Sequence, residues 1–199
     1  IEPVAAATLT DLAPLPLEPV TLLLVGLDAD QIDDPVNNAA PRGRANADAV
    51  MLLRVDAQQP LQVLQIPIEL ALQLPGQTAP AQLGSLWKTG GVALLRDAIR
   101  EVVGLPADHP HRYVLLPRRV LRSLVNGLGD LDVTLNASFQ RTDKAQNYTV
   151  NLQAGRQSLN GSQAEQLARY LKDSLDDPNR RLRQQLLIRA LLEQFRAPG

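Results

Sequence analysis

The sequence predicts one domain of the α/β or α+β class. Short apolar runs typical of buried strands alternate with amphipathic segments of helical spacing along most of the chain. The 199 residues suffice for one sizeable core, and 45% hydrophobic with 21% charged residues is ordinary globular usage. The sequence has no internal repeat and no low-complexity run, so neither a solenoid nor a disordered chain is indicated.

Composition also narrows the possible functions. A net charge of −1 gives no general attraction to nucleic acid, and 3% aromatic residues offer few side chains for stacking on bases. The absence of cysteine excludes thiol catalysis, thiolate metal sites and disulfides, and it is compatible with an extracytoplasmic location. The chain begins with Ile1 and not with Met, so we expect an upstream segment to have been removed.

The first third of the chain predicts a lead-in segment and three strands. Residues 1–20 are rich in proline and small residues, and residues 21–27 (TLLLVGL) form an apolar run typical of a strand buried on both faces. Residues 31–47 contain several Pro, Gly and Asn residues and are predicted to be a loop. Residues 49–55 and 61–66 are apolar runs on either side of a polar turn, so we expect an antiparallel hairpin.

The middle of the chain alternates between helices and strands. The amphipathic residues 91–103 predict a helix that stops at Gly104, since glycine is favoured just past a helix C-terminus. The same rules predict extended chain at 68–74, strands at 113–116, 130–135 and 148–152, a helix at 117–126, and a polar loop at 139–146.

Residues 155–185 form a predominantly helical stretch with two predicted helix starts. Ser162 and Glu165 have the spacing of a capping box, and apolar residues at helical spacing accompany them: Ala164, Leu167, Ala168, Leu171 and Leu175. Asp177-Pro178 predicts the second start, because aspartate suits the N-cap and proline suits the first helical position.

Three arginines, Arg180, Arg181 and Arg183, lie in the first two turns of the second helix, where the helix dipole favours negative charge. Two interpretations are open: a solvated cluster partly neutralised by Asp176 and Asp177, or an anion site for phosphate or carboxylate. The face of this helix is polar at its start and apolar beyond, as shown by Arg180, Gln184, Leu187, Leu191 and Phe195. It suits a ligand with a charged head and an apolar tail, or an ordinary core helix.

Acidic residues flank the predicted central strands. Asp28 and Asp30 follow the first strand, and Asp48 opens the second. They suit either a ligand site or capped turns, and their oxygens could hold a divalent metal. His109 and His111 are the only histidines, and a pair spaced by proline offers too few convergent ligands for us to assign a metal there. The sequence has no GxSxG, Walker, GxGxxG or HExxH motif.

The order of these segments resembles the LytR-CpsA-Psr family. Residues 126–171 resemble the family run of an LGGVDV strand, a polar loop and a helix ending in an arginine pair, and residues 179–185 (NRRLRQQ) resemble its closing GRxxRQQ. Three upstream family motifs have counterparts in VGLD at 25–28, DAVM at 48–51 and QIPIE at 65–69. We therefore expect residues 21–199 to form a domain of this type.

The resemblance implies an α/β fold, a single-domain three-layer α-β-α sandwich with a central mixed sheet and a hydrophobic pocket. It also implies an extracytoplasmic cell-envelope phosphotransferase. Such proteins move a glycopolymer, for example teichoic acid or capsule, from a polyprenyl pyrophosphate carrier onto the glycan of the cell wall, with Mg²⁺ assisting. The full-length protein would be anchored in the membrane through its N-terminal segment.

Site residues can be carried over by position from the resemblance. Asp28 and Asp48 would be the metal-associated pair, and Asp28 and Arg169 would be catalytic. The residues expected to contact the lipid head group are Arg44, Arg169, Arg180, Arg183 and Gln184.

Three arginines of the family pattern are replaced in this chain, by Asn46, Ile68 and Leu171. Each charge-assisted bond to phosphate is worth roughly 1.5–3 kcal/mol, so their loss weakens pyrophosphate binding by orders of magnitude unless other cations replace them. Arg44 is a candidate replacement for the first. Three functions are therefore open: a glycopolymer transferase, a catalytically impaired relative that binds lipid phosphate or acts as a scaffold, and a structural envelope domain.

Overall fold

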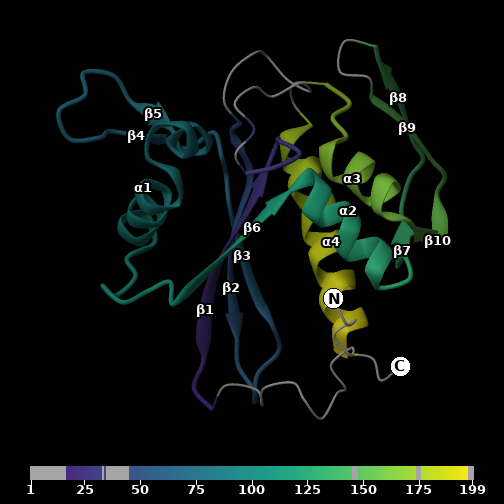
Figure 1. Ribbon diagram of the computed structural model, residues 1–199, viewed down its shortest axis with the longest axis horizontal. Helices are drawn as coiled ribbons and strands as arrows, with labels where there is room; N and C mark the ends of the chain where they lie inside the picture. Colours follow the sequence, from purple (N-terminus) through teal and green to yellow (C-terminus); the bar gives the residue numbers. More distant parts are fainter. Residues whose placement is uncertain (1–16, 33, 35–44, 145–147, 174–175, 197–199) are drawn as a thin grey trace, which may run out of the picture.

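The computed structural model describes residues 17–32, 34, 45–144, 148–173 and 176–196. At its centre lies a four-stranded mixed sheet in the order β3-β2-β1-β6 (Figure 1). Strands β1 (Val20–Leu27) and β2 (Ala47–Val55) are antiparallel, β3 (Gln62–Ile66) is antiparallel to β2, and β6 (Arg112–Pro117) is parallel to β1. The predicted hairpin of the second and third strands is confirmed.

Helices cover both faces of this sheet. Helix α1 (Leu86–Val103) lies on one face, and α2 (Arg118–Gly127), α3 (Gly161–Arg169) and α4 (Asp177–Arg196) lie on the other (Figure 1). Successive strand side chains point to opposite faces, so Leu23 and Val25 join the core under α1 while Leu24 joins the core under the other three helices. This is the three-layer α-β-α arrangement that the resemblance implies.

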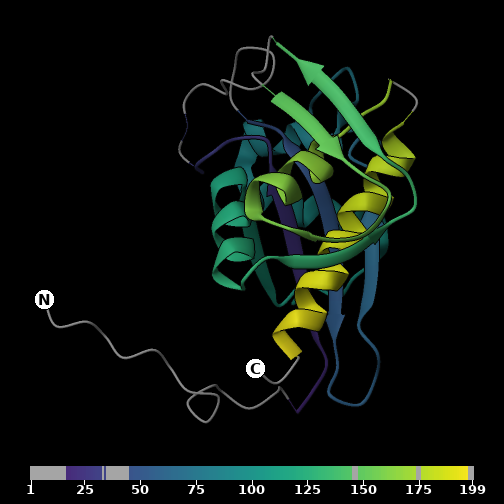
Figure 2. The same cartoon turned by 90° about the vertical axis from the view of Figure 1, so that its right-hand side faces the viewer.

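Smaller strand pairs complete the described chain. Strand β7 (Leu131–Leu135) pairs with β10 (Gly155–Leu159), β8 (Phe139–Asp143) with β9 (Tyr148–Leu152), and β4 (Ala71–Leu72) with β5 (Ala81–Gln82), which leads into the 3-10 turn η2 (Leu83–Ser85). Figure 2 shows the β8–β9 hairpin near the first half of α4. Within the described ranges, no helix has both the length and the apolar character needed to cross a bilayer.

Two predicted segments differ from the structure because their strands lie at the surface. Residues 139–146, predicted as a polar loop, contain β8, and residues 155–159, assigned to the helical stretch, form β10. Both strands carry mostly exposed polar side chains, so they lack the apolar alternation that marks a half-buried strand. Helix α1 also begins earlier than predicted, at Leu86, and its backbone is non-helical at Gly90 and Gly91.

The predicted capping box of α3 is wrong. Asn160 and not Ser162 is the N-cap: its side chain accepts from the Gln163 N–H at 2.9 Å, and the Gln163 side chain accepts from the Asn160 N–H at 3.0 Å. Glu165 pairs instead with arginines. The helix ends at Arg169, before the predicted Leu171, and Leu175 lies outside the described residues. Two capping boxes overlap in this sequence, and the pairing of Glu165 favours the earlier one.

The start of α4 is shifted by one residue from the prediction. Asp177 is the first residue of the helix, and the Asp176 carbonyl accepts the Arg180 N–H at 2.9 Å. The Asp176 carboxylate also accepts a hydrogen bond from Asn179 Nδ2 at 2.8 Å. Asp176 therefore does the capping that was predicted for Asp177.

Gly161 allows α3 to approach α2 closely. A Cβ atom on Gly161 would lie 2.2 Å from the carbonyl oxygen of Arg122 and 2.7 Å from its Cα. The Gly161 N–H donates to Asn126 Oδ1 at 2.7 Å, which joins the two helices at the same point. Because the obstructing atoms belong to the backbone, they cannot move aside as the tip of a side chain does, and the contact requires glycine.

We expect Gly161→Ala to lower the free energy of unfolding by about 3 kcal/mol or more, because α2 or α3 must shift. The matched control is Gly127→Ala at the end of α2, where an added Cβ meets nothing within 4 Å. Alanine is the better helix former, so the control should be neutral or slightly stabilising. Urea denaturation followed by circular dichroism measures both variants, and equal stabilities would contradict the close contact of α2 with α3.

Candidate functional site

A β-bulge places two carboxylates at one end of the central sheet. Gly26 pairs with Ala49 and Leu27 pairs with Ala47, so Asp48 is the extra residue of β2 at this point. A bulge bends its strand and re-aims the extra side chain. The strands are also close here, since a Cβ on Gly26 would lie 3.1 Å from the Ala49 Cβ. The local backbone thus brings Asp48 next to the end of β1, where Asp28 follows.

Asp28 is tied to the segment that leads into β2. Its Oδ1 accepts the Asn46 N–H at 2.8 Å, and its own N–H donates to the Asn46 carbonyl at 3.3 Å. Burial raises the pKa of Asp28 above its usual value, against the opposing effect of this hydrogen bond and of the positive charges of Arg118 and Lys88. Asn46, which replaces a family arginine, therefore contributes through its backbone.

The two carboxylates interact with each other and with arginines of two helices. Burial, followed by the negative charge of Asp28, raises the pKa of Asp48 to about 6, while Arg180 and Arg169 act in the opposite direction. Asp28 also feels the positive charge of Arg169. The structure therefore brings together four of the residues expected from the sequence: Asp28, Asp48, Arg169 and Arg180.

An apolar cavity of about 80 Å³ lies between the sheet and the helices α2, α3 and α4. Most of its lining is hydrophobic: Leu24, Leu27, Ala49, Met51, Leu116, Leu121, Ala168, Leu187 and Ile188. The polar side chains in the lining are Arg118, Glu165, Arg169 and Gln184. The cavity is well below the roughly 300–1,000 Å³ of typical ligand sites. A long apolar chain therefore does not fit the cavity as it stands.

Ion pairs connect the charged groups beside this cavity. Asp30 pairs with Arg118 at 3.6 Å and with Arg122 at 2.9 Å. Glu165 pairs with Arg122 and, at 3.0 Å, with Arg169. Arg118 is only 9% exposed, and its Nε has no hydrogen-bond partner in the described structure. This leaves Arg118 as a buried cation with an unused donor in the wall of the cavity.

The arginines at the start of α4 are paired with carboxylates; Arg180 is buried and Arg181 is partly exposed. Arg180 pairs with Asp177 at 2.7 Å and lies 4.0 Å from Glu69, which also pairs with Arg181 at 3.1 Å. The Arg180 side chain is 11% exposed. Gln184, one turn further, accepts from Gln65 Nε2 at 2.8 Å. Both neutralising aspartates considered above are therefore present: Asp177 pairs with Arg180, and Asp176 pairs with Arg183, and both arginines are buried.

Two predicted head-group contacts do not join this group. Arg44 lies outside the described residues. Arg183 faces the other side of α4, where its guanidinium pairs with Asp176 at 2.8 Å and lies over the rings of Phe139 and Tyr170. It lines a separate groove and not the apolar cavity.

The sequence reasoning missed the arginines of α2. Arg118 and Arg122 are spaced four apart, which places them on one face of the helix, and they directly follow β6. Because β6 is parallel to β1, its carboxyl end meets the same edge of the sheet as Asp28. That edge is where α/β proteins usually bind ligands, so the pair could have been found once the two strands were known to be parallel neighbours.

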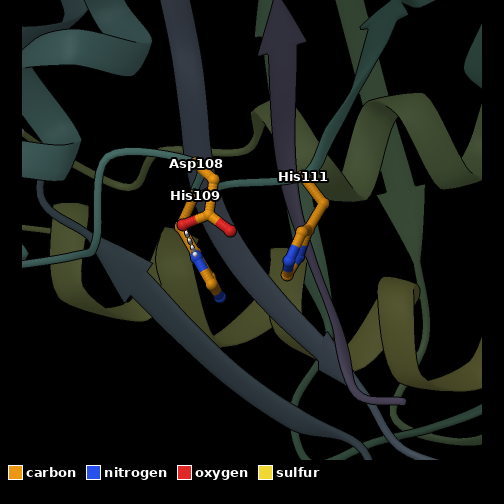
Figure 3. A group of neighbouring side chains, drawn as sticks. All are labelled: Asp108, His109 and His111. Atoms are coloured by element: carbon orange, nitrogen blue, oxygen red, sulfur yellow. Dashed lines mark hydrogen bonds and ion pairs between the residues drawn. The ribbon is translucent and has the colours of Figure 1, made fainter.

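A second cluster of possible metal ligands, Asp108, His109 and His111, lies at the other end of β1. Their ligand atoms are all within 4.8 Å of one another, and both imidazole rings point the same way (Figure 3). The centroids of the two imidazole rings are 4.1 Å apart. His111 Nδ1 accepts the Thr21 N–H at 3.0 Å, so a neutral ring carries its proton on Nε2. His111 therefore has no free lone pair, and we assign no metal to the cluster.

Comparisons with known proteins agree with this architecture. Polyisoprenyl-teichoic acid–peptidoglycan teichoic acid transferase TagU of Enterococcus faecalis is 26% identical over 181 residues, which cover 89% of this chain and 54% of that protein. The chain thus spans about half the length of this curated relative.

Solved structures share the fold. TagV of B. subtilis superposes with a TM-score of 0.73 at 21% identity, over 93% of this chain and 68% of that one. TagT with bound octaprenyl pyrophosphate lipid gives a TM-score of 0.65 at 21% identity, over 92% of this chain and 67% of that one. The LytR_cpsA_psr family model matches residues 8–199. The chain belongs to the LytR-CpsA-Psr family.

Proposed function

We propose that this domain binds a polyprenyl-linked phosphate or pyrophosphate and transfers the attached glycopolymer to a cell-wall glycan. The observation that carries the proposal is the meeting of an apolar cavity with buried arginines and a carboxylate pair at one edge of the sheet. Such a site matches an amphiphile with an anionic head. The relatives support the same substrate class, since TagU is named as a teichoic acid transferase and TagT was solved with octaprenyl pyrophosphate.

The cellular setting belongs to the same proposal. A polyprenyl carrier and a cell-wall acceptor meet outside the cytoplasm, at the outer face of the membrane. We therefore place the domain in the cell envelope, and we propose that a segment beyond the described residues anchors the full-length protein to the membrane.

Arg118 is our candidate for one of the missing cations. Asn46, Ile68 and Leu171 stand where family arginines are expected, and Arg118 is a buried guanidinium beside the cavity that already acts on Asp28. Its Nε lacks a partner, so a phosphoryl oxygen entering the site gains a donor without breaking an existing bond. The lost head-group contacts are thus replaced in part from α2.

The proposed reaction is a phosphoryl transfer. The acceptor hydroxyl oxygen bonds to the phosphorus that carries the glycan, and the bond from that phosphorus to the bridging oxygen breaks, so polyprenyl phosphate leaves with the electron pair. The hydroxyl proton passes to the Asp28 carboxylate. In this proposal Arg169 and Arg180, whose positive charges act on Asp48, also offset the negative charge that builds up on the phosphoryl oxygens.

The carboxylate pair fits a divalent cation. Asp28 and Asp48 are desolvated and repel each other, and carboxylate oxygens are preferred ligands of Mg²⁺. When bound there, Mg²⁺ would supply positive charge to the phosphoryl oxygens. The remaining functions of orientation and head-group binding stay with the arginines.

A second candidate function is a lipid-phosphate-binding module without turnover. Glu69 favours it, because its carboxylate takes up Arg181 and approaches Arg180, where a substrate phosphate would otherwise be the partner. The two candidates bind the same lipid and differ only in whether a phosphoryl bond is broken.

We expect Arg118→Ala to weaken binding of octaprenyl phosphate by about 10- to 100-fold, which corresponds to the loss of one charge-assisted hydrogen bond. Arg119→Ala is the matched control, because Arg119 is exposed on the same turn of α2. Titration in detergent, followed by intrinsic fluorescence or calorimetry, measures both affinities. If both variants bind as the wild type does, Arg118 is not a head-group ligand.

Turnover separates the two candidate functions. With octaprenyl pyrophosphate, Mg²⁺ and water as the acceptor, the transferase should release inorganic phosphate. Asp28→Asn should reduce this rate by about 100-fold or more while the lipid still binds, since the amide keeps the oxygen that accepts the Asn46 N–H but cannot take a proton. Binding by the wild type without phosphate release to water, and without phosphoryl transfer to an added glycan acceptor, would favour the non-catalytic module.

Ionisation of Asp48 should make the metal-free protein less stable at neutral pH than at pH 4, as far as this one group is concerned. Its folded pKa of about 6 exceeds the unfolded value of 3.8, so stability falls as the pH rises from about 4 to 6 and stays lower above that. Asp48→Asn should therefore raise the free energy of unfolding by about 2 kcal/mol at pH 7.5 and have little effect at pH 4.

Urea denaturation of both proteins in EDTA at the two pH values measures this difference. Comparing the two proteins at the same pH cancels the contributions of other carboxylates. Mg²⁺ at pH 7.5 should stabilise the wild type more than Asp48→Asn. If Asp48→Asn is less stable than the wild type at pH 7.5, the ionised Asp48 carboxylate does not destabilise the folded protein, and the prediction is wrong.

A further inference from the structure

A groove of about 590 Å³ lies on the side of α4 opposite the apolar cavity. One wall is the chain from the end of β7 to the start of β8, and the other is the first half of α4 with the segment that precedes it. We call it the β8–α4 groove, and its described lining is Thr134, Leu135, Asn136, Ala137, Ser138, Phe139, Tyr170, Lys172, Asp176, Asn179, Leu182, Arg183 and Leu186.

The floor of the β8–α4 groove is a stack of two aromatic rings and a guanidinium. The Arg183 guanidinium carbon lies 5.3 Å from the Phe139 ring centre and 5.1 Å from that of Tyr170, and the two rings meet edge to face at 5.1 Å. Arg183 is 8% exposed, and its Nε is a buried donor without a hydrogen-bond partner in the described structure. Phe139 is 8% exposed and Tyr170 is partly exposed, so the floor offers the uncovered part of the Tyr170 side chain beside a charged group held by Asp176.

Asp176 makes this wall rigid. Its carboxylate accepts from the Lys172 N–H at 3.0 Å, from Asn179 Nδ2 at 2.8 Å and from Arg183 Nη2 at 2.8 Å. Burial acts against ionisation, but these hydrogen bonds and the charge of Arg183 hold the pKa of Asp176 below its usual range. The carboxylate is thus ionised and fully engaged, so the groove is formed before any ligand arrives.

The rim of the groove combines uncharged polar groups with apolar surface. Thr134, Asn136 and Asn179 are exposed and carry hydroxyl or amide groups that both donate and accept. Leu182 is a large apolar side chain that is 61% exposed on the wall formed by α4. Of the charged residues in the described lining, Asp176 and Arg183 neutralise each other, which leaves Lys172. This balance does not favour a polyanion.

Sugar rings fit this combination. A pyranose has C–H faces that pack on aromatic and aliphatic side chains, and a rim of hydroxyl and amide groups that pair with Asn, Thr and Lys. The volume is in the range of established ligand sites. A lipid tail would instead require a lining as apolar as that of the cavity on the other side of α4.

The groove shares the first turns of α4 with the proposed head-group site, which lies on the other side of that helix. Arg183 borders Gln184, which lines the apolar cavity, and Asp176 precedes Asp177, the partner of Arg180. We propose that the β8–α4 groove binds a short stretch of uncharged or weakly charged glycan, the acceptor chain of the cell wall, and holds it beside the lipid-linked phosphate. The identity of this glycan as acceptor rests on the proposed function, whereas its binding does not.

The test is a titration of the full chain with a peptide-free tetrasaccharide of β-1,4-linked N-acetylhexosamines, followed by ligand-observed NMR. Leu182→Asp should weaken binding by about tenfold, because it removes the exposed apolar contact, and Asn136→Ala should weaken it by a smaller factor. Leu64→Asp is the matched control: Leu64 is 50% exposed on β3 and does not line the groove. All three residues are exposed, and circular dichroism checks that each variant folds.

Octaprenyl phosphate binding serves as the independent readout. The inference expects Leu182→Asp to lose the tetrasaccharide and keep the lipid. It is overturned if the wild type does not bind the tetrasaccharide, if Leu64→Asp weakens binding as much as Leu182→Asp does, or if a cell-wall stem peptide without sugar binds in the groove instead. If the wild type binds the tetrasaccharide through the groove but no polyprenyl phosphate, the binding site stands and the proposed function fails.

Discussion

The pairing of β1 with β2 holds two carboxylates together against their mutual repulsion, and the rest of the site follows from this constraint. Asp28 is fixed by the Asn46 backbone, and Asp48 is the extra residue of the bulge. Negative charge at a partly desolvated edge needs positive charge nearby. The helices of that face supply it, with Arg118 from α2, Arg169 from α3 and Arg180 from α4. The ends of three helices therefore converge on one edge of the sheet.

Glu165 links this charged edge to the packing of the helices. It is 8% exposed and pairs with Arg122 and Arg169, so it joins α2 to α3 directly above the apolar cavity. Gly161 brings the same two helices into backbone contact at the start of α3. Both contacts therefore join the helices that border the cavity. If the proposed lipid enters between these helices and the sheet, the ion pairs of Glu165 lie in its path.

The sequence predicts the central strands, α2 and α4 well, because their apolar periodicity reports burial in the sheet and under the helices. It misses β8 and β10, whose side chains face solvent, and it places the α3 cap at Ser162 because local spacing cannot show that Glu165 has long-range partners. Asp28, Asp48, Arg169 and Arg180 lie near enough for their charges to affect one another, while the roles that the resemblance implies for them stay predictions. Arg118 could not be found in the same way, because its proposed role depends on β6 lying beside β1. Arg183 faces away from the apolar cavity, because neighbouring helix positions face about 100° apart.

That difference between adjacent positions places α4 between the apolar cavity on one side and the β8–α4 groove on the other. The cavity is lined on this helix by Gln184, Leu187 and Ile188. The groove is lined by Asn179, Leu182 and Arg183. A helix of this kind cannot be displaced on one side without changing the shape of the other. By thermodynamic reciprocity, whatever occupies one compartment alters affinity in the second by the same factor that it experiences in return. If the proposed donor lipid displaces α4 outward, it also changes the affinity of the groove on the opposite side for its own ligand.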